Sequence, residues 1–214
     1  MVRLLLVDDH SLVRAALKQL LLAELDVESV AEAGSGEEAI SVATTYCPDV
    51  ILMDIIMPGI GGLEATRRLL RINPRFKIIV LTAHAEGPIP MRTLEAGAIG
   101  CLTKGCTTDE MLQAIAMVQR GEQYVCTEIA QQIVKTHVGG QRSQIGSLSR
   151  RELQVLLMVS QGKKNQEISE RLCLSPKTIS TYRTRLFNKL GVRTDVALAH
   201  IALCHGLVEP RSRT

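Results

Sequence analysis

The chain has 214 residues, of which 46% are hydrophobic, 22% charged and 2% aromatic, and its formal net charge is +3. This composition is close to the globular average, so the chain can bury a substantial core in one or two domains. The apolar runs are far shorter than the roughly 20 residues of a transmembrane helix, and the first residues show no secretory signal. We therefore expect a cytoplasmic protein with no membrane partner, whose six cysteines are reduced thiols.

The net charge conceals an asymmetry between the two halves of the chain. Residues 1–125 contain 11 Lys and Arg against 16 Asp and Glu, a charge of −5, whereas residues 126–214 contain 14 against 6, a charge of +8. The basic second half indicates a nucleic-acid partner. The scarcity of aromatic residues argues against stacking platforms for single-stranded bases.

Short apolar runs alternate with helical periodicity through the first 120 residues. The runs predict β-strands, and the amphipathic stretches between them predict α-helices. Strands are expected at residues 3–8, 27–33, 49–54, 77–82 and 99–103, and helices at about 11–24, 36–46, 62–72, 88–97 and 107–120. Five βα units in series predict an α/β fold with a five-stranded, parallel, doubly wound sheet.

The pattern changes after Gly121. Residues 126–137 predict one more helix, and VGGQRSQIGS at 138–147 is typical of a flexible linker. From residue 148 onward only helical periods occur, which predicts an all-α second domain. Its expected landmarks are a capping box of Ser149 and Glu152, helices at about 150–162 and 164–172, a third helix capped by Ser175 and ended by Gly191, and a last helix at about 194–205.

Polar residues end the predicted strands of the first half. Asp8 and Asp9 follow the first strand, Asp54 ends the third, Thr82 the fourth, and Lys104 follows the fifth. Because parallel strands place their carboxyl ends along one edge of the sheet, all five should face one crevice. Three carboxylates form a hard oxygen site suited to Mg²⁺, which would also offset the repulsion between the adjacent Asp8 and Asp9.

A carboxylate beside Mg²⁺ can attack phosphorus and form an aspartyl phosphate, and Asp54 is the best candidate because it stands alone on the central strand. Lys104 and the metal would neutralise the transferred phosphoryl oxygens, and the Thr82 hydroxyl would report the phosphate. Singly, Asp9 could be only a helix N-cap and Asp54 an ordinary turn residue. A Mg²⁺-dependent aspartyl phosphatase is a rival, although such enzymes carry DxD on the first strand and this chain has DD.

The segment SPKTISTYRTRLFNKL, residues 175–190, combines an apolar stripe with a basic, hydroxyl-bearing face. A shorter helix and a tight turn precede it, which suits a recognition helix in the major groove of double-stranded DNA. On this helix alone, a merely solvated basic face is at least as good an interpretation. The residues expected to pack inward are Ile179, Tyr182, Leu186 and Leu190, and those expected on the open face are Lys177, Ser180, Thr181, Thr184, Arg185 and Asn188.

Four motifs, VDDH, LMDIIMPGIGGLEATR, VLTAH and LTKG, resemble the receiver domain of two-component response regulators. The resemblance implies a flavodoxin-like receiver at residues 1–121 with strand order 2-1-3-4-5, in which Asp54 accepts a phosphoryl group from a sensor histidine kinase. It also implies Mg²⁺ ligation by Asp9, Asp54 and the backbone carbonyl of Ile56, assisted by Asp8. Thr82 and Lys104 match the switch threonine and the lysine of the family.

One position departs from the receiver pattern. Receivers usually carry Tyr or Phe three residues before the lysine, where this chain has Cys101. That aromatic side chain moves with the threonine during activation, so its loss leaves the phosphorylation chemistry intact but questions the usual route of signal transmission. A regulator that acts without phosphorylation is therefore an alternative. For Cys101 itself we expect a buried, inert thiol in preference to a redox role.

The segment LSRRELQVLLMVSQGKKNQEISERLCLSPKTISTYRTRLFNKLGV resembles the four-helix helix-turn-helix domain of LuxR/NarL type. This domain would span residues 148–210, after a linker at 122–147 that contains one helix. The last helix would dimerise through an apolar stripe of Val196, Leu198, Ala199, Ile201, Ala202 and Leu203. The implied DNA contacts are Lys177, Ser180, Thr181 and Thr184, then Arg183, Arg185 and Lys189, and Tyr182, which replaces a histidine common at this place.

Together the two halves resemble a NarL/FixJ-type response regulator close to the GacA/UvrY branch. The resemblance implies a DNA-binding transcriptional regulator that is not an enzyme, although its receiver assists its own phosphorylation and dephosphorylation. A sensor kinase of the hybrid type would phosphorylate Asp54 and favour a homodimer on promoter DNA, with RNA polymerase as a further candidate partner. The branch also implies global control of secondary metabolism or virulence traits through small regulatory RNAs.

Overall fold

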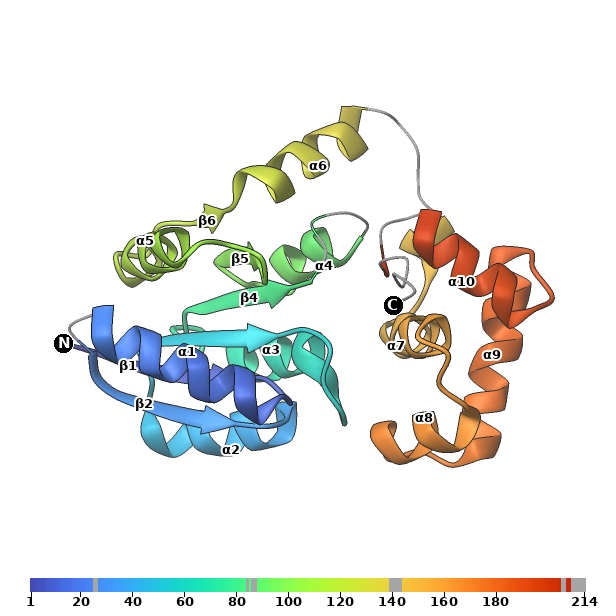
Figure 1. Cartoon of the computed structure of the whole chain (residues 1–214), viewed down its shortest axis with the longest axis horizontal. Helices are drawn as coiled ribbons and strands as arrows, with labels where there is room; N and C mark the ends of the chain where they lie inside the picture. Colours follow the sequence, from blue (N-terminus) through green and yellow to red (C-terminus); the bar gives the residue numbers. More distant parts are fainter. Residues whose placement is uncertain (25–26, 84, 86–87, 139–143, 205–206, 209–214) are drawn as a thin grey trace. The chain divides into compact units, whose positions relative to one another are not determined.

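Figure 1 shows the computed structural model of the chain, which describes residues 1–24, 27–83, 85, 88–138, 144–204 and 207–208. These residues form two compact units, one from Met1–Ala85 and Ile89–Ile133 and the other mainly from Val134 onward. Residues 139–143 of the predicted linker and residues 209–210 at the predicted domain end lie outside the described residues. Within the described part, no helix has the length and apolar character that a bilayer span requires.

The first unit contains a six-stranded sheet in the order β2-β1-β3-β4-β5-β6, in which every neighbouring pair is parallel. The order of the first five strands confirms the predicted flavodoxin-like fold. The sequence does not predict β6, because two residues are too few to show a period. The strands are β1 (Val2–Val7), β2 (Val27–Ala33), β3 (Val50–Asp54), β4 (Ile78–Thr82), β5 (Gly100–Thr103) and β6 (Tyr124–Val125).

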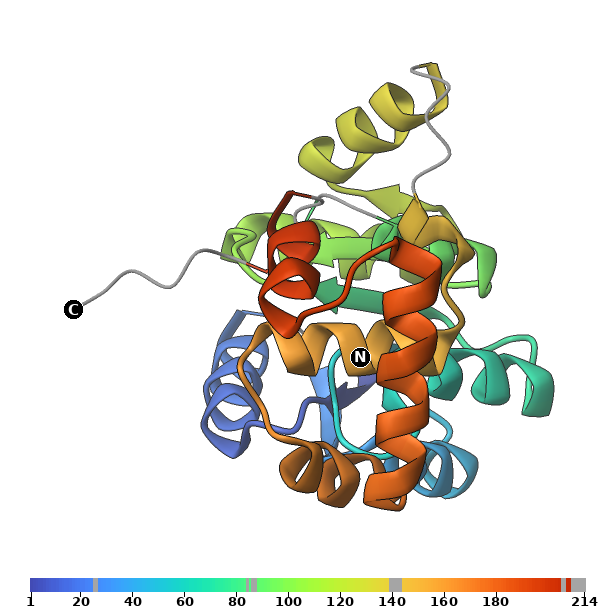
Figure 2. The same ribbon diagram turned by 90° about the vertical axis from the view of Figure 1, so that its right-hand side faces the viewer.

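The sheet is covered on both faces by helices. β3, β4 and β5 are buried at every position, as continuous apolar strands must be in such a sheet, whereas the edge strand β2 is only half-buried. Figure 2 shows α1 on one side of the sheet and α2 and α3 on the other. The helices are α1 (Ser11–Glu24), α2 (Gly36–Tyr46), α3 (Gly61–Ile72), α4 (Ile89–Glu95) and α5 (Thr108–Gln119).

The second unit is helical, as predicted. It contains a short 3₁₀ helix, η1 (Gln144–Ser147), then α7 (Arg150–Ser160), α8 (Asn165–Leu172), α9 (Pro176–Leu190) and α10 (Asp195–Cys204), whereas α6 (Thr127–Val138) precedes them and spans the division between the units. The predicted capping box of Ser149 and Glu152 is present at the start of α7. Ser175 caps α9, and Gly191 ends that helix in the left-handed conformation with φ 67°.

Candidate functional site

Backbone hydrogen bonds bring the ends of the strands to one edge of the sheet. The N–H of Asp8 donates to the carbonyl of Ala33 at 3.2 Å, which fixes the end of β1 against β2. The N–H of Lys104 donates to the carbonyl of Thr82 at 2.7 Å, which fixes the residue after β5 against the end of β4. Because the sheet is parallel, the side chains that follow β1, β3, β4 and β5 meet at this edge.

Lys104 holds two carboxylates from distant parts of the chain. Its Nζ lies 2.8 Å from Oδ2 of Asp8 and 2.8 Å from Oδ2 of Asp54. Both carboxylate side chains are only 3% exposed, and that of Lys104 is 30% exposed. A buried carboxylate is costly without a positive partner, and here one ammonium group serves two. The predicted convergence of Asp8, Asp54 and Lys104 is therefore present in the structure.

The shared ammonium group leaves the two carboxylates electrostatically different. Burial raises the pKa of Asp54 to about 6, although Lys104 opposes that shift. Burial also acts to raise the pKa of Asp8, but hydrogen bonds from Lys104 and from the backbone N–H of His10 outweigh it, so this pKa is lowered. For Lys104, burial favours a lower pKa, and the attraction of Asp54 and Asp8 overcomes it and raises the pKa. The ammonium group thus stays charged between two acids.

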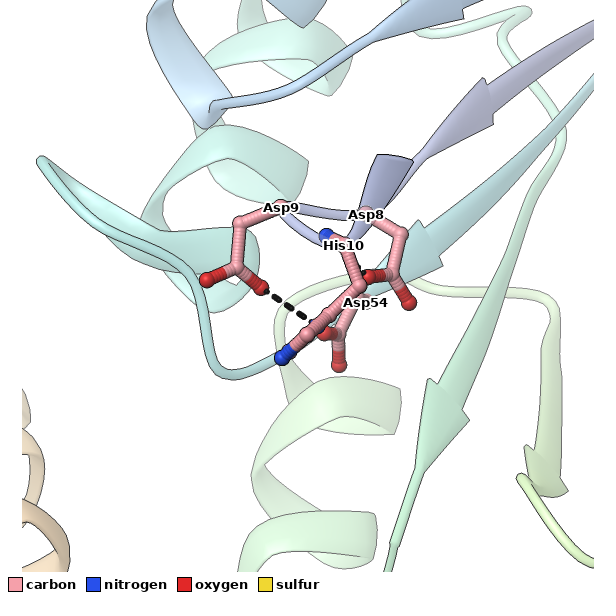
Figure 3. A group of neighbouring side chains, drawn as sticks. All are labelled: Asp8, Asp9, His10 and Asp54. Carbon is pink, nitrogen blue, oxygen red and sulfur yellow. Dashed lines mark hydrogen bonds and ion pairs between the residues drawn. The ribbon is translucent and has the colours of Figure 1, made fainter. Parts of the chain in front are cut away.

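Asp9 completes an acidic cluster with a buried oxygen that has no donor. Figure 3 shows Asp8, Asp9, His10 and Asp54 as neighbours, with one ligand atom of each within 4.8 Å of the others. Oδ1 of Asp9 accepts no hydrogen bond from the described residues, although Nδ1 of His10 lies 3.1 Å away. An unsatisfied buried carboxylate oxygen among other hard oxygen donors fits a divalent cation such as Mg²⁺.

The loop after β3 is held close to Asp54. The N–H of Ile56 donates to Oδ1 of Asp54 at 3.3 Å, so the backbone turns around the carboxylate. The N–H of Gly62, at the start of α3, donates to the carbonyl of Ile55 at 3.0 Å. A Cβ atom on Gly62 would lie 1.9 Å from the carbonyl oxygen of Asp54, so only glycine permits this approach.

Two of the predicted residues lie in the neighbouring strands. Thr82 is the last residue of β4 and is 2% exposed, at the same edge as Asp54. Cys101 lies within β5 and is fully buried, and the hydroxyl of Thr93 on α4 donates toward its sulfur at 3.8 Å. Burial raises the pKa of the Cys101 thiol to about 12, so the reactive thiolate form is strongly disfavoured.

Two residues that sequence reasoning does not single out support the acidic cluster. The backbone N–H of His10 donates to Oδ1 of Asp8 at 2.8 Å, and its ring nitrogen Nδ1 lies 3.0 Å from the same oxygen. Arg14, one turn into α1, donates from Nη1 to the backbone carbonyl of Asp8. The signal for His10 is its place directly after the acidic pair. Arg14 has no comparable signal, because its contact depends on how α1 docks.

In the second unit, α9 presents the predicted polar face to solvent. The hydroxyls of Ser180, Thr181 and Thr184 each donate to the carbonyl four residues earlier at 3.1 Å, and those of Thr181 and Thr184 keep their oxygen lone pairs for other donors. Exposed side chains on this face are those of Lys177, Ser180, Thr181, Thr184, Arg185 and Asn188, as predicted, and Ile179, Leu186 and Leu190 are buried. The guanidinium carbon of Arg185 lies over the ring of the half-buried Tyr182, 5.9 Å from the centre of that ring.

The structure turns the other two predicted cations of α9 toward partners within the helical unit. Nζ of Lys189 lies 2.7 Å from Oε2 of Glu152, whose side chain is 4% exposed. Arg183 donates to Oδ1 of Asn165 at 2.7 Å and forms an ion pair with Asp195. Arg183 and Lys189 therefore lie apart from the open face that contains Lys177 and Arg185.

The apolar stripe predicted on the last helix is divided in the structure. Leu198 and Ala202 are fully buried, so they are not part of a free surface on α10. Val196 is 79% exposed and Leu203 is 38% exposed. The exposed part of the predicted stripe is therefore smaller than helical periodicity suggests, because α7 and α9 already cover two of its members.

Two family models match the chain. The response regulator receiver domain matches residues 4–116, and the luxR family of bacterial regulatory proteins matches residues 146–202. The first match covers the acidic cluster and Lys104, and the second covers all of α7, α8 and α9.

Relatives are similar over nearly the whole chain. The response regulator UvrY of Escherichia coli strain K12 is 46% identical over 209 residues, which are 97% of this chain and 96% of UvrY. The response regulator GacA of Pseudomonas aeruginosa is 46% identical over 214 residues, which are 99% of this chain and 100% of GacA. RcsB of Salmonella enterica serovar Typhimurium, solved bound to the promoter P1flhDC with the phosphomimetic BeF3-, is 26% identical, with a TM-score of 0.70 and coverage of 95% of this chain and 98% of that one.

Proposed function

This chain belongs to the response regulators that join a receiver domain to a LuxR-type DNA-binding domain, and we propose that Asp54 is its phosphoacceptor. The observation that carries the proposal is the position of Lys104, whose Nζ lies 2.8 Å from both Asp54 and Asp8. A nucleophilic carboxylate beside a fixed ammonium group can accept a phosphoryl group whose negative oxygens the ammonium then stabilises.

In the proposed reaction, a carboxylate oxygen of Asp54 attacks the phosphorus of a phosphohistidine on a sensor kinase. The new O–P bond forms as the P–N bond breaks. The electron pair of the P–N bond returns to the imidazole nitrogen, which takes up a proton from solvent. Lys104 moves its hydrogen bond from the carboxylate to a phosphoryl oxygen. Asp9, Asp54 and the carbonyl of Ile56, assisted by Asp8, would hold Mg²⁺, which supplies further positive charge at the phosphoryl oxygens when bound.

The phosphoryl group would add about −1.5 to −2 charges at the edge of the sheet. Thr82 lies at this edge and would donate its hydroxyl proton to a phosphoryl oxygen. Because Thr82 ends β4 and Lys104 follows β5, phosphorylation would change the contacts at the ends of both strands. We propose that this change favours a homodimer, and that two copies of α9 then bind paired half-sites with linked affinity. Lys177, Ser180, Thr181, Thr184 and Arg185 are the contacts that the exposed face of α9 supports.

The proposed biological role is transcriptional control in the cytoplasm. The phosphodonor would be a sensor histidine kinase of the hybrid type, and RNA polymerase would be a partner at the promoter. By resemblance to the GacA/UvrY branch, the proposed targets are genes for small regulatory RNAs that control secondary metabolism or virulence traits. The basic helical unit, with α9 exposed, supports the DNA-binding part of this proposal.

Labelling with a small phosphodonor tests the phosphoacceptor. The full chain is treated with acetyl phosphate and Mg²⁺, and covalent phosphate is measured by intact-protein mass spectrometry. Asp54→Asn should remove the label, whereas Asp49→Asn, a matched change at the partly exposed acid that pairs with Arg3, should retain it. Undiminished labelling of Asp54→Asn would contradict the assignment.

Turnover and DNA binding distinguish the alternatives. Repeated rapid hydrolysis of small phosphate esters would favour an aspartyl phosphatase over a regulator. Equal DNA affinity with and without the phosphodonor would favour a regulator that acts without phosphorylation. We expect neither of these two results. The acidic cluster retains Lys104 and its three acids, and Cys101 is a buried thiol.

A further inference from the structure

Arg183 differs from the other cations of α9 in its surroundings. Its side chain is only 16% exposed, although the neighbouring Thr184 and Arg185 are exposed. Nη1 donates to Oδ1 of Asn165 at 2.7 Å, and Nη2 donates to Oδ2 of Asp195. Asn165 is the first residue of α8, and Asp195 is the first residue of α10. One guanidinium group therefore joins three helices.

The hydrogen-bond chain continues from Asn165 to the open face of α9. Nδ2 of Asn165 donates to Oγ of Ser180 at 3.1 Å, and the Ser180 hydroxyl donates its own proton to the carbonyl of Pro176 at 3.1 Å. The hydroxyl proton of Ser180 and one of its lone pairs are thus already in use. Compared with Thr181 and Thr184, Ser180 has less hydrogen-bonding capacity left for a base edge.

The charge of Arg183 is also in use. Asp195 neutralises it, and a DNA phosphate that approached this guanidinium would meet the negative carboxylate of Asp195 as well. Burial lowers the pKa of Arg183, which reflects the same loss of contact with solvent. The guanidinium of Arg185 on the open face lies over the ring of Tyr182, and it forms no ion pair with an acid within the described part of the chain. The two arginines should therefore serve different purposes.

We propose that Arg183 is a positioning residue for DNA recognition, and that the chain Asp195–Arg183–Asn165–Ser180 sets how α9 presents its polar face. The inference rests on the proposed role of α9 in reading DNA. A guanidinium group fixes geometry more strictly than a lysine can, because its planar donors hold the acceptors of Asn165 and Asp195 at once. Loss of the chain should let α9 shift against α8, which weakens readout of base edges more than contact with phosphates.

The test compares binding to two duplexes with the full chain, treated with phosphodonor. One duplex is selected from a random pool by the wild-type protein, and the other is a scrambled sequence of the same composition. Binding constants are measured over a series of KCl concentrations, so that each variant yields a discrimination ratio and a salt slope. Each phosphate contact contributes about 0.9 to that slope, so the slope reports loss of a phosphate contact directly.

Asp195→Asn, Asn165→Ala and Arg183→Lys should each lower the discrimination ratio by about 3- to 10-fold, the loss expected for one or two hydrogen bonds. Their salt slopes should stay as in the wild type. The matched control Arg185→Gln should weaken binding to both duplexes and reduce the slope by about 1. The double variant Asn165→Ala/Asp195→Asn should lose less than the sum of the two single losses, because both act through Arg183.

Several outcomes would overturn the inference. Tighter binding of Asp195→Asn to both duplexes would show that freed Arg183 contacts phosphate, and full additivity of Asn165→Ala and Asp195→Asn would show no connected chain. An unchanged discrimination ratio in both single variants would also show that the chain does not set how α9 presents its polar face. Equal loss on both duplexes with a lowered melting temperature would indicate a merely structural role, and Asn165→Ala, which leaves the ion pair intact, guards against misfolding of the others. If the wild type itself selects no duplex, the proposed function fails instead.

Discussion

The acidic cluster and the open face of α9 are built in opposite ways. The cluster joins Asp8, Asp54 and Lys104, which lie up to 96 residues apart, and their charges are largely buried. The open face comes from one continuous helix, and the hydroxyls of Thr181 and Thr184 bond only to carbonyls of the same helix. Chemistry on a phosphoryl group requires charges held away from water, whereas reading DNA requires an exposed and contiguous surface.

This difference determines where mutations should act. In the cluster, one change disturbs several strands at once and alters charge in a place with little solvent screening. On the open face of α9, a change should alter binding and leave stability nearly unaltered.

The largest effect is expected from removal of the shared ammonium group. Lys104→Met removes the ammonium group that two buried carboxylates share, and with it a positive charge beside the transferred phosphoryl group. We expect a loss of about 10²- to 10³-fold in the rate of labelling by acetyl phosphate, measured by mass spectrometry. Lys18→Met, which breaks a partly exposed pair between Lys18 on α1 and Glu32 on β2, should label normally. Equal labelling rates in both variants would show that phosphorylation does not depend on the ammonium group of Lys104.

Close backbone packing beside Asp54 predicts the next effect. Gly62→Ala would place a methyl group 1.9 Å from the carbonyl oxygen of Asp54, so α3 must move away from β3. We expect the free energy of unfolding of the first unit to fall by about 3 kcal/mol, seen by calorimetry of the full chain. Gly105→Ala, where a Cβ would meet nothing within 4 Å, should change it by less than about 0.5 kcal/mol.

Restoring the aromatic residue usual in receivers should harm this protein. Cys101 is fully buried against Thr93, so the larger ring of Cys101→Phe would force the surrounding side chains apart. We expect a loss of about 2 kcal/mol in the stability of the first unit, from thermal unfolding. The small change Cys101→Ala should cost less. A Cys101→Phe variant as stable as the wild type would show that the site has room for a moving aromatic side chain.

The ion pair between the buried Glu152 and the exposed Lys189 should stabilise the helical unit in a pH-dependent way. Burial acts to raise the pKa of Glu152, but Lys189 and the Ser149 cap outweigh it and lower this pKa below its ordinary value. The folded unit therefore binds a proton less readily than the unfolded chain, and the stabilisation is complete above the ordinary pKa and is lost as the pH falls through the folded value.

Lys189→Met should consequently reduce stability by about 1 kcal/mol at neutral pH, and by less under acid conditions. Thermal unfolding at a series of pH values measures the difference. The exposed lysine at the other end of α9 supplies a control, Lys177→Met, which should show no such trend. A constant difference at all pH values would exclude the charge pair as its cause.

The smallest change in stability is expected on the open face. Thr184→Val keeps the shape of the side chain but removes a hydroxyl that bonds only to its own helix. Stability should stay within about 0.5 kcal/mol of the wild type. Affinity for a selected duplex should fall by about 2- to 10-fold if this hydroxyl contacts a base or a phosphate. A large loss of stability would mean that the Thr184 hydroxyl also has a partner outside α9.

Much of the fold can be predicted from the sequence because buried parallel strands have continuous apolar runs. β2, α1 and α2 match the expected ranges, and the other strands of the predicted five differ by a residue or two. The convergence of Asp8, Asp54 and Lys104 is predictable for the same reason, since parallel strands share one carboxyl edge. β6 is not predictable, because Tyr124 and Val125 pair with β5 through tertiary contact alone.

The direction of single side chains on a helix is harder to predict. Helical spacing places Lys189 and Arg183 among the basic residues of α9, but their partners Glu152 and Asp195 lie on other helices. Leu198 and Ala202 belong to an apolar stripe by sequence, and the packing of α10 on α7 buries them. In each case the deciding contact is with another helix, whereas helical periodicity describes only the residues of one helix.

The small strand β6 also bears on how this protein can be divided into fragments. The N–H of Tyr124 donates to the carbonyl of Ile99, and the N–H of Cys126 donates to the carbonyl of Cys101, both at 3.1 Å. A fragment ended at Gly121, the predicted limit of the receiver, would leave the backbone groups of β5 bare. Bare strand edges recruit other chains, so such a fragment should self-associate, and one that extends past Cys126 should remain monomeric at the same concentration.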